Sequence, residues 1–166
     1  MIINMNCLPW QQEEVIKRTQ LIISSFEHWL GHSLFQEKGL PDDKTSPLEI
    51  AQQLFEADFI VASHGIESDP IFNYGNQKAL DVWELTWEEF IRTPSRKTAE
   101  EAEQKERDRL LAETTEKGFC YFSCIRITST GKRFQINNGI VWNVIDNQGN
   151  FQGQAAIYSD YFFLSK

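Results

Sequence analysis

The first third of the chain carries apolar residues at the spacing of one buried helix face. Between Trp10 and Leu30 they recur about every 3.6 positions, at Val15, Ile16, Ile22, Ile23 and Phe26. Gly31 follows directly and predicts the end of this helix. A polar loop then leads to the segment Ser46–Glu49, a capping-box pattern with proline in the first helical position. A short helix is therefore predicted over residues 47–56.

The pattern changes to short strands in the middle of the chain. Residues 58–64 and 71–74 are rich in strand-forming side chains, with a turn between them. Asn76 then occupies the N-cap position of a short helix. Capping-box patterns follow at Thr86 and Thr98. The second of these predicts a helix of about 20 residues that ends before Gly118.

The last third of the chain predicts an antiparallel meander. Its strands cover residues 119–128, 133–145 and 151–163, and polar turns separate them. Together with the two earlier strands, they form a five-stranded antiparallel sheet. The predicted fold class is α+β, with short helices on one face of the sheet and an N-terminal helical extension.

Composition narrows the class of protein. A hydrophobic content of 41% with 24% charged residues is typical of a globular chain and argues against disorder. The net charge of −8 argues against nucleic-acid binding, which depends on neutralising phosphates with Lys and Arg. Residues 1–7 lack the basic start of a signal peptide, and no apolar run has the length of a membrane span. We therefore expect a cytoplasmic protein with reduced thiols and no membrane partner.

Particular strings in the second half are similar to known families. IFNYGNQKALDVWELTWEEF (residues 71–90) resembles the segment of PAS domains in which an Asn starts a helix after the second strand. A closer resemblance is to the MEKHLA domain, a PAS-related family. It is carried by FNYGNQKALDVWELTWEEFIRTPSRKTAE (residues 72–100), GFCYFSCIRITSTGKRFQINNGIVWN (residues 118–143) and GQAA (residues 153–156). The resemblance, to the stand-alone bacterial type, implies a PAS-like sensory domain over residues 58–166. Residues 1–57 are then the helical extension.

A PAS-like fold implies a cavity between the sheet and its short helices, so polar residues on an apolar face become candidate ligand contacts. Strict alternation places Asn138 on such a face. It shares that face with the further candidates Phe134, Ile136 and Trp142. The alternative is a β-bulge at Gly139 that turns Asn138 outward.

Three other residues are pocket candidates, each with a simpler interpretation. Ser123 faces inward if its strand alternates, or its hydroxyl bonds to nearby backbone. His64 ends the first strand, where it titrates near neutral pH, ligates a haem or is purely structural. Trp83 lies one helical turn before Trp87, and the pair either stacks on a ring-shaped ligand or belongs to the core. Arg92 and Arg96 are an anion clamp or part of the solvated surface.

No catalytic motif and no metal-binding spacing occurs in the sequence, so we expect no enzyme and no metal site. A flavin photoadduct is disfavoured because no Cys lies between Asn76 and Gly118. The cofactor therefore stays unassigned. The leading hypothesis is a sensory domain that binds a small molecule and signals through a partner protein. The alternatives are a ligand-free protein–protein interaction module and a small enzyme that uses the cavity. A homodimer is compatible with each of them.

Overall fold

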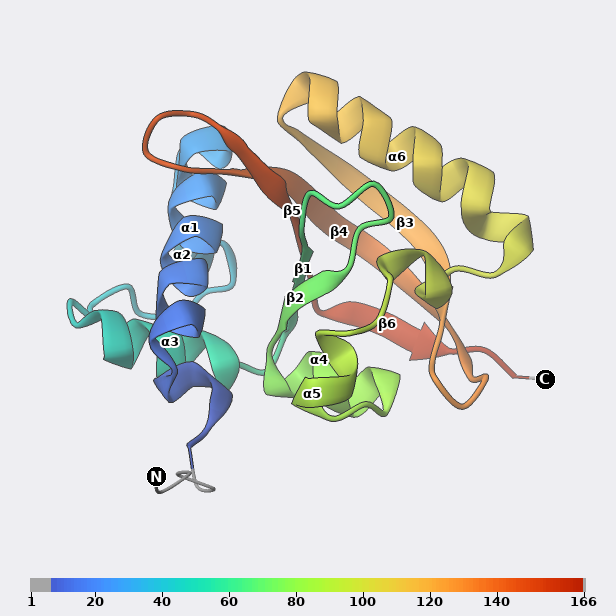
Figure 1. Ribbon diagram of the computed structural model, residues 1–166, viewed down its shortest axis with the longest axis horizontal. Coiled ribbons are helices and arrows are strands. Elements are labelled where there is room, and N and C mark those ends of the chain that lie inside the picture. Colours follow the sequence, from blue (N-terminus) through green and yellow to red (C-terminus); the bar gives the residue numbers. More distant parts are fainter. Residues whose placement is uncertain (1–6, 166) are drawn as a thin grey trace.

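The computed structural model describes residues 7–165, and within them one antiparallel sheet forms the centre of the fold (Figure 1). Its strand order is β2-β1-β5-β4-β3, and β6 pairs with β4. The strands are β1 (Ile60–His64), β2 (Phe72–Gly75), β3 (Phe119–Ile127), β4 (Arg133–Ile145), β5 (Phe151–Tyr158) and β6 (Asp160–Phe163). The predicted antiparallel sheet is confirmed, with its last strand divided into β5 and β6.

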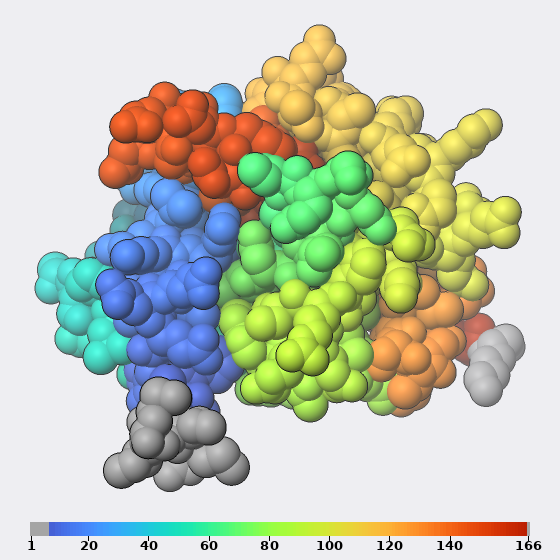
Figure 2. Space-filling model, in the orientation of Figure 1, coloured from blue at the N-terminus to red at the C-terminus, as the bar shows by residue number. Residues whose placement is uncertain are grey.

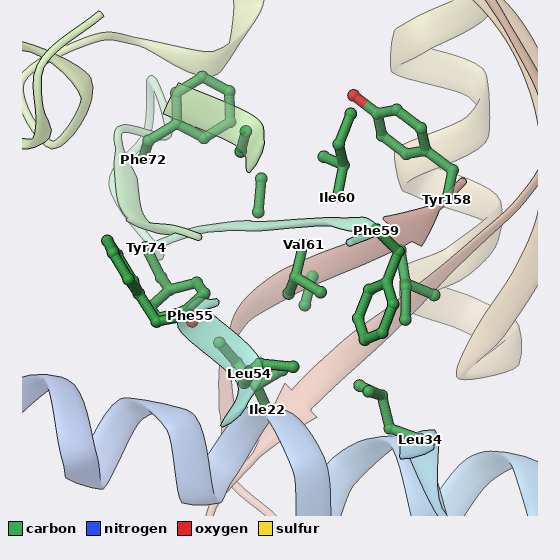
Figure 3. Close-up of a cluster of buried hydrophobic side chains, with 14 of the residues drawn as sticks. Ile22, Leu34, Leu54, Phe55, Phe59, Ile60, Val61, Phe72, Tyr74 and Tyr158 are labelled. Carbon is green, nitrogen blue, oxygen red and sulfur yellow. The ribbon is translucent and has the colours of Figure 1, made fainter. Parts of the chain in front are cut away.

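Helices cover both faces of this sheet (Figure 1). One layer contains α1 (Glu13–Leu30), α2 (Leu34–Glu37) and α3 (Pro47–Phe55). The other contains α4 (Gln77–Trp83), α5 (Trp87–Phe90) and α6 (Gln104–Lys117). The core therefore has two parts, and β1 contributes to both. Val61 points toward Ile22 and Leu54, whereas Ile60 points to the opposite face beside Tyr158 (Figure 3).

Helix α1 packs across the outer face of the sheet. Its buried residues follow the helical period: Val15, Thr19, Ile22, Ser25 and Phe26. The indole N–H of Trp142 donates to the carbonyl of Ile22 at 3.1 Å, and its ring lies edge-on to Phe26 with centroids 5.0 Å apart. In the space-filling view α1 lies directly against the green β1–β2 segment (Figure 2). The predicted boundary at residue 57 thus separates segments of the chain that share one core in space.

The fully buried side chain of Asn76 joins three elements. Its Oδ1 accepts hydrogen bonds from the backbone N–H of Val61 at 3.1 Å and of Ala79 at 3.2 Å. Its Nδ2 donates to the carbonyls of Leu54 at 3.2 Å and Phe59 at 2.7 Å. The predicted cap of α4 is confirmed, and the same amide ties α4 to β1 and to the end of α3.

The predicted helix ends are correct except at the start of α6. Ser46 and Thr86 accept the expected capping hydrogen bonds, and Gly118 follows the last turn of α6 with φ +98°. The prediction that a helix starts at Thr98 is wrong. The hydroxyl of Thr98 donates to the carbonyl of Ser95 at 2.7 Å within a 3-10 turn, so it does not cap a helix, and α6 begins later.

Replacing Asn76 with Ala should destabilise the whole domain. The change leaves two N–H groups and two carbonyls in the core without their partner. The expected loss is roughly 3–5 kcal/mol in the free energy of unfolding, measured by urea denaturation. The exposed Asn147→Ala is the matched control and should stay within about 0.5 kcal/mol of the parent. A comparably small loss for Asn76→Ala would contradict its central role.

Candidate functional site

A cavity of about 90 Å³ lies between the inner face of the sheet and the helices α4 and α6. This is the location of the pocket predicted from the sequence. Its polar and charged lining residues are Ser63, His64, Ser95, Thr98, Arg107, Arg126 and Gln154. Its larger apolar and aromatic lining residues are Phe72, Trp83, Leu110, Leu111, Phe122, Ile136, Val141 and Tyr158.

Trp83 is the centre of the aromatic side of the cavity. Its ring centroid lies 6.0 Å from that of Phe72, 5.7 Å from that of Phe134 and 6.4 Å from that of Tyr158. Phe122 approaches Tyr158 from β3, with centroids 6.5 Å apart. Most of these pairs meet edge to face, a favourable arrangement for aromatic rings. The rings therefore hold one another in place and form a rigid wall.

Three polar atoms of the lining have no hydrogen-bond partner among residues 7–165: the indole N–H of Trp83, the hydroxyl of Tyr158 and Nε2 of His64. Trp83 is 4% exposed and Tyr158 is 2% exposed. Burial raises the pKa of Tyr158 well above its ordinary value, so the phenol keeps its proton and is able to donate. An unpaired buried group costs about 1–3 kcal/mol. A molecule that pairs with these atoms would recover that energy.

His64 presents an acceptor to the cavity. Its Nδ1 lies 3.1 Å from the carbonyl oxygen of Gly65, a contact in which the ring nitrogen donates. Burial lowers the pKa of His64, the hydrogen bond to Gly65 opposes this shift, and the positive charge of Arg107 adds to it. The imidazole is therefore neutral at pH 7, and Nε2 carries a lone pair.

Two arginines belong to the lining on the side of α6 and β3. Arg107 is 8% exposed, and its Nη2 donates to the hydroxyl of Ser95. Burial lowers the pKa of Arg107, and the positive charge of Arg126 lowers it further. The guanidinium remains charged even so, because its ordinary pKa is far above neutrality. The cavity thus combines cationic donors, neutral donors and neutral acceptors.

Asn138 lies outside the cavity, so the prediction that it lines the pocket is wrong. Phe122 pairs with Gly139 and Cys124 pairs with Ile136, so two residues of β4 oppose Ser123 alone. This is a β-bulge, in which Asn138 adopts φ +55° and is exposed. Its Nδ2 donates to Asp160 Oδ2 at 3.4 Å. The alternative interpretation, a bulge that turns Asn138 outward, describes the structure.

The bulge also divides the predicted apolar face of β4. Ile136 lines the cavity before the bulge, and Val141 lines it afterwards. Trp142 consequently lies on the outer face under α1. Phe134 is buried in contact with Trp83, with ring centroids 5.7 Å apart, but it does not line the cavity. Local alternation is a poor guide here because an extra residue in one strand exchanges its two faces.

The other candidates divide between cavity and surface. Trp83 and His64 line the cavity. Ser123 is exposed, and its Oγ accepts a hydrogen bond from the N–H of Asn138 at 3.4 Å, which corrects its inward placement. Arg96 binds the exposed carboxylate of Asp69 at 3.0 Å, as expected for a solvated surface.

The sequence analysis missed Arg107, Gln154 and Tyr158. Arg107 precedes the lining residues Leu110 and Leu111 by three and four positions, which is the spacing of one helix face. This spacing is the feature of the sequence from which the burial of Arg107 could have been predicted. Gln154 and Tyr158 share the cavity face of β5 through alternation.

The volume of the cavity limits which groups it can hold. Pockets for drug-sized molecules measure roughly 300–1,000 Å³, well above this cavity, so a flavin or haem does not fit. Both cysteines near the site, Cys120 and Cys124, lie on β3. Within residues 7–165, no group of His, Cys, Asp and Glu is suited to holding a metal ion. No helix in the same range combines the length and the apolar character of a membrane span.

The strand order, the helices on the inner face and the cavity beneath α6 define a PAS-like fold, and comparisons with solved structures agree. A PAS domain of a protein from Colwellia psychrerythraea matches 70% of this chain and 94% of its own, with a TM-score of 0.59 at 10% identity. A light-oxygen-voltage domain studied with a flavin analogue matches 71% and 86%, with a TM-score of 0.56 at 13% identity. A PAS domain from a two-component sensor histidine kinase matches 68% and 91%, with a TM-score of 0.53 at 12% identity.

The family assignment rests on the sequence. The family model described as MEKHLA domain matches residues 16–163, which include most of α1 and the whole sheet. The chain therefore belongs to the MEKHLA domain family, a PAS-related family of sensory domains. A comparison with curated proteins finds no match.

The bulge predicts a specific response at Asn138. Asn138→Gly should leave the free energy of unfolding within about 0.5 kcal/mol of the parent, since glycine accepts φ +55° without strain. Asn138→Val should cost roughly 1–2 kcal/mol, because a β-branched residue is strained in the left-handed region. Asn137→Val, on the same strand without a positive φ, is the control for thermal unfolding. Equal effects of valine at both positions would contradict the bulge geometry.

The lowered pKa of His64 predicts a pH-dependent contribution to stability. Between its folded value and the ordinary 6.5, the unfolded chain binds more protons, so stability rises with pH and is lost as pH falls through the folded pKa. His64→Gln should therefore reduce the slope of unfolding free energy between about pH 5 and pH 7. The exposed His28→Gln is the control for replacing a histidine outside the cavity. An unchanged slope in His64→Gln would show that His64 is not held neutral.

Proposed function

We propose that this chain is a sensory input domain that binds a small molecule in the cavity and passes its presence to a partner protein through α6. The observation that carries the proposal is that three residues lining one cavity, Trp83, Tyr158 and His64, each bear a buried polar atom without a hydrogen-bond partner in residues 7–165. Stable interiors pair their polar groups. A bound molecule would supply partners of this kind.

The size of the cavity limits the ligand. The cavity of about 90 Å³ is well below the roughly 300–1,000 Å³ of pockets for drug-sized molecules, so only a small molecule fits. This corresponds to a metabolite of a few non-hydrogen atoms. A larger ligand would require α6 to move away from the sheet.

Helix α6 is suited to transmit occupancy because polar contacts attach it to the sheet. Gln154 Nε2 donates to the carbonyl of Leu111 at 3.0 Å and to the hydroxyl of Thr115 at 3.1 Å. Asn143 Nδ2 donates to the carbonyl of Thr115 at 3.2 Å. Since α6 also supplies Arg107 to the cavity wall, a ligand that contacts the wall favours one position of the helix over another. The outer surface of α6 would report that position to a partner.

A ligand-free interaction module is the second candidate, and exposed aromatic residues favour it. Tyr121 on β3 is 66% exposed, and Phe162 on β6 is 51% exposed. Large apolar side chains gathered on a surface often mark contact with another protein. Under this alternative, the cavity has no role and the sheet edge alone binds the partner.

Filling the cavity separates the two candidates. Ala156 lines the cavity from β5, so Ala156→Leu should place its side chain where the ligand lies, with Ala156→Val as the milder form if leucine overpacks the core. Native mass spectrometry of protein purified without additives, followed by a small-molecule screen monitored by NMR at the Trp83 indole N–H, measures binding. The parent should bind a molecule and the filled variant should not.

The surface substitution Ala102→Leu adds the same side chain at an exposed position and should bind like the parent. If no molecule shifts the Trp83 signal in the parent, or if the filled variants bind equally well, the proposed function is wrong. The interaction module then stands as the better explanation.

A further inference from the structure

The charged side chains that line the cavity are cationic. Arg107 and Arg126 both belong to the lining, and no Asp or Glu of residues 7–165 does. The nearest carboxylate to Arg107 is that of Asp108, whose Oδ1 lies 3.3 Å from Nη1 but whose side chain is 70% exposed. The interior of the cavity therefore carries a positive charge that solvent-exposed carboxylates only partly balance.

Neither arginine has a full set of partners. Beyond Asp108, Arg107 donates to the neutral hydroxyl of Ser95. Arg126 donates to the carbonyl of Ile125 at 2.9 Å and forms no ion pair within the described part of the chain. A buried charge is costly unless an opposite charge or several hydrogen bonds compensate it. An anion between the two guanidinium groups would supply both.

The rest of the cavity wall indicates an organic molecule. The indole N–H of Trp83 and the hydroxyl of Tyr158 add neutral donors to the two guanidinium groups. Phe72 and Ile136 contribute apolar surface near Trp83, on the side of α4, β2 and β4. A ligand that matches these walls has an anionic group at one end and a short apolar body at the other.

The arginines also lie on a plausible route into the cavity. A second hollow of about 250 Å³ lies between α6 and β3 and is open at the surface. It shares Arg107, Leu110, Phe122 and Arg126 with the cavity. These four side chains therefore separate the cavity from the hollow. The carboxylates of Glu106 and Glu113 also line the hollow, where both pair with Arg109. A ligand entering between α6 and β3 therefore reaches the guanidinium groups of Arg107 and Arg126 at the boundary between the hollow and the cavity, where their positive charge favours an anion.

We propose that the ligand of this domain is a small organic carboxylate, whose carboxylate group binds Arg107 and Arg126 while its body lies against Trp83. The inference rests on the proposed function and specifies its ligand class. Planar guanidinium groups match carboxylates in geometry and bind them through charge-assisted hydrogen bonds. The hydroxyl of Tyr158 and Nε2 of His64 complete the contacts, and a hydroxyl group on the ligand would donate to the latter.

The test compares acids with neutral molecules of the same shape. Propanoate and lactate are titrated against propanamide and lactamide at constant ionic strength, and binding is followed by NMR at the Trp83 indole N–H, assigned with Trp83→Phe. At least one carboxylate should bind about 10-fold or more tightly than its amide. Arg107→Met should weaken carboxylate binding about 10- to 100-fold and leave amide binding unchanged.

Lys105→Met is the matched control. It removes the same charge from the same helix at an exposed position outside the cavity, and carboxylate binding should stay as in the parent. Arg126→Met provides a second variant if Arg107→Met does not fold, since Arg107 is the more deeply buried of the two. Equal weakening by Lys105→Met would reduce the effect to general surface charge and overturn the assignment.

Failure of this inference differs from failure of the proposed function. If neutral molecules from the screen bind the cavity and carboxylates do not, the ligand class is wrong while the sensory proposal stands. Binding of inorganic phosphate in preference to every carboxylate also overturns the ligand class. If nothing shifts the Trp83 signal, the proposed function itself fails.

Discussion

The fold depends on satisfying the backbone groups where α3, β1 and α4 meet beneath the sheet. The buried amide of Asn76 pairs with four of these groups, the N–H of Val61 and Ala79 and the carbonyls of Leu54 and Phe59. An amide is suited to this position because it offers donors and acceptors together. Fixing α4 against β1 in turn places Trp83 at the end of α4, and Trp83 forms the aromatic wall of the cavity.

The side chains that pack between helix and sheet differ in polarity on the two faces of the sheet. On the outer face, α1 covers closely packed apolar side chains, and hydrogen bonds of Trp142, Ser25 and Trp29 join the helix to β4 at its edge. On the inner face, Gln154 and Asn143 bind α6 through hydrogen bonds, and Arg107 lies among apolar residues. Polar networks in a low-dielectric interior are costly when they are incomplete. The inner face is therefore where a ligand changes the energy of the domain most.

Membership of the MEKHLA family and the PAS-like fold determine the architecture of this protein, but they do not determine what its cavity binds. The similar solved structures share 10% to 13% identity with this chain, a level that indicates a common fold. The flavin analogue named with one of them belongs to that protein. The cavity of this chain is small and has two arginines in its lining, and its function has to be argued from these residues because function depends on the site.

Local features of this protein could be predicted from its sequence: the amphipathic α1 that ends at Gly31, the cap at Asn76, the strands and their turns. Each depends on neighbouring residues, through periodicity, capping or turn chemistry. The site depended on tertiary structure. Two residues of β4 oppose Ser123, which turns Asn138 outward, and the packing of α6 against β3 places Arg107 and Arg126 in the lining of one cavity. Strand pairing and helix packing bring together residues that are far apart in the chain. Local sequence patterns do not indicate which of these residues come into contact.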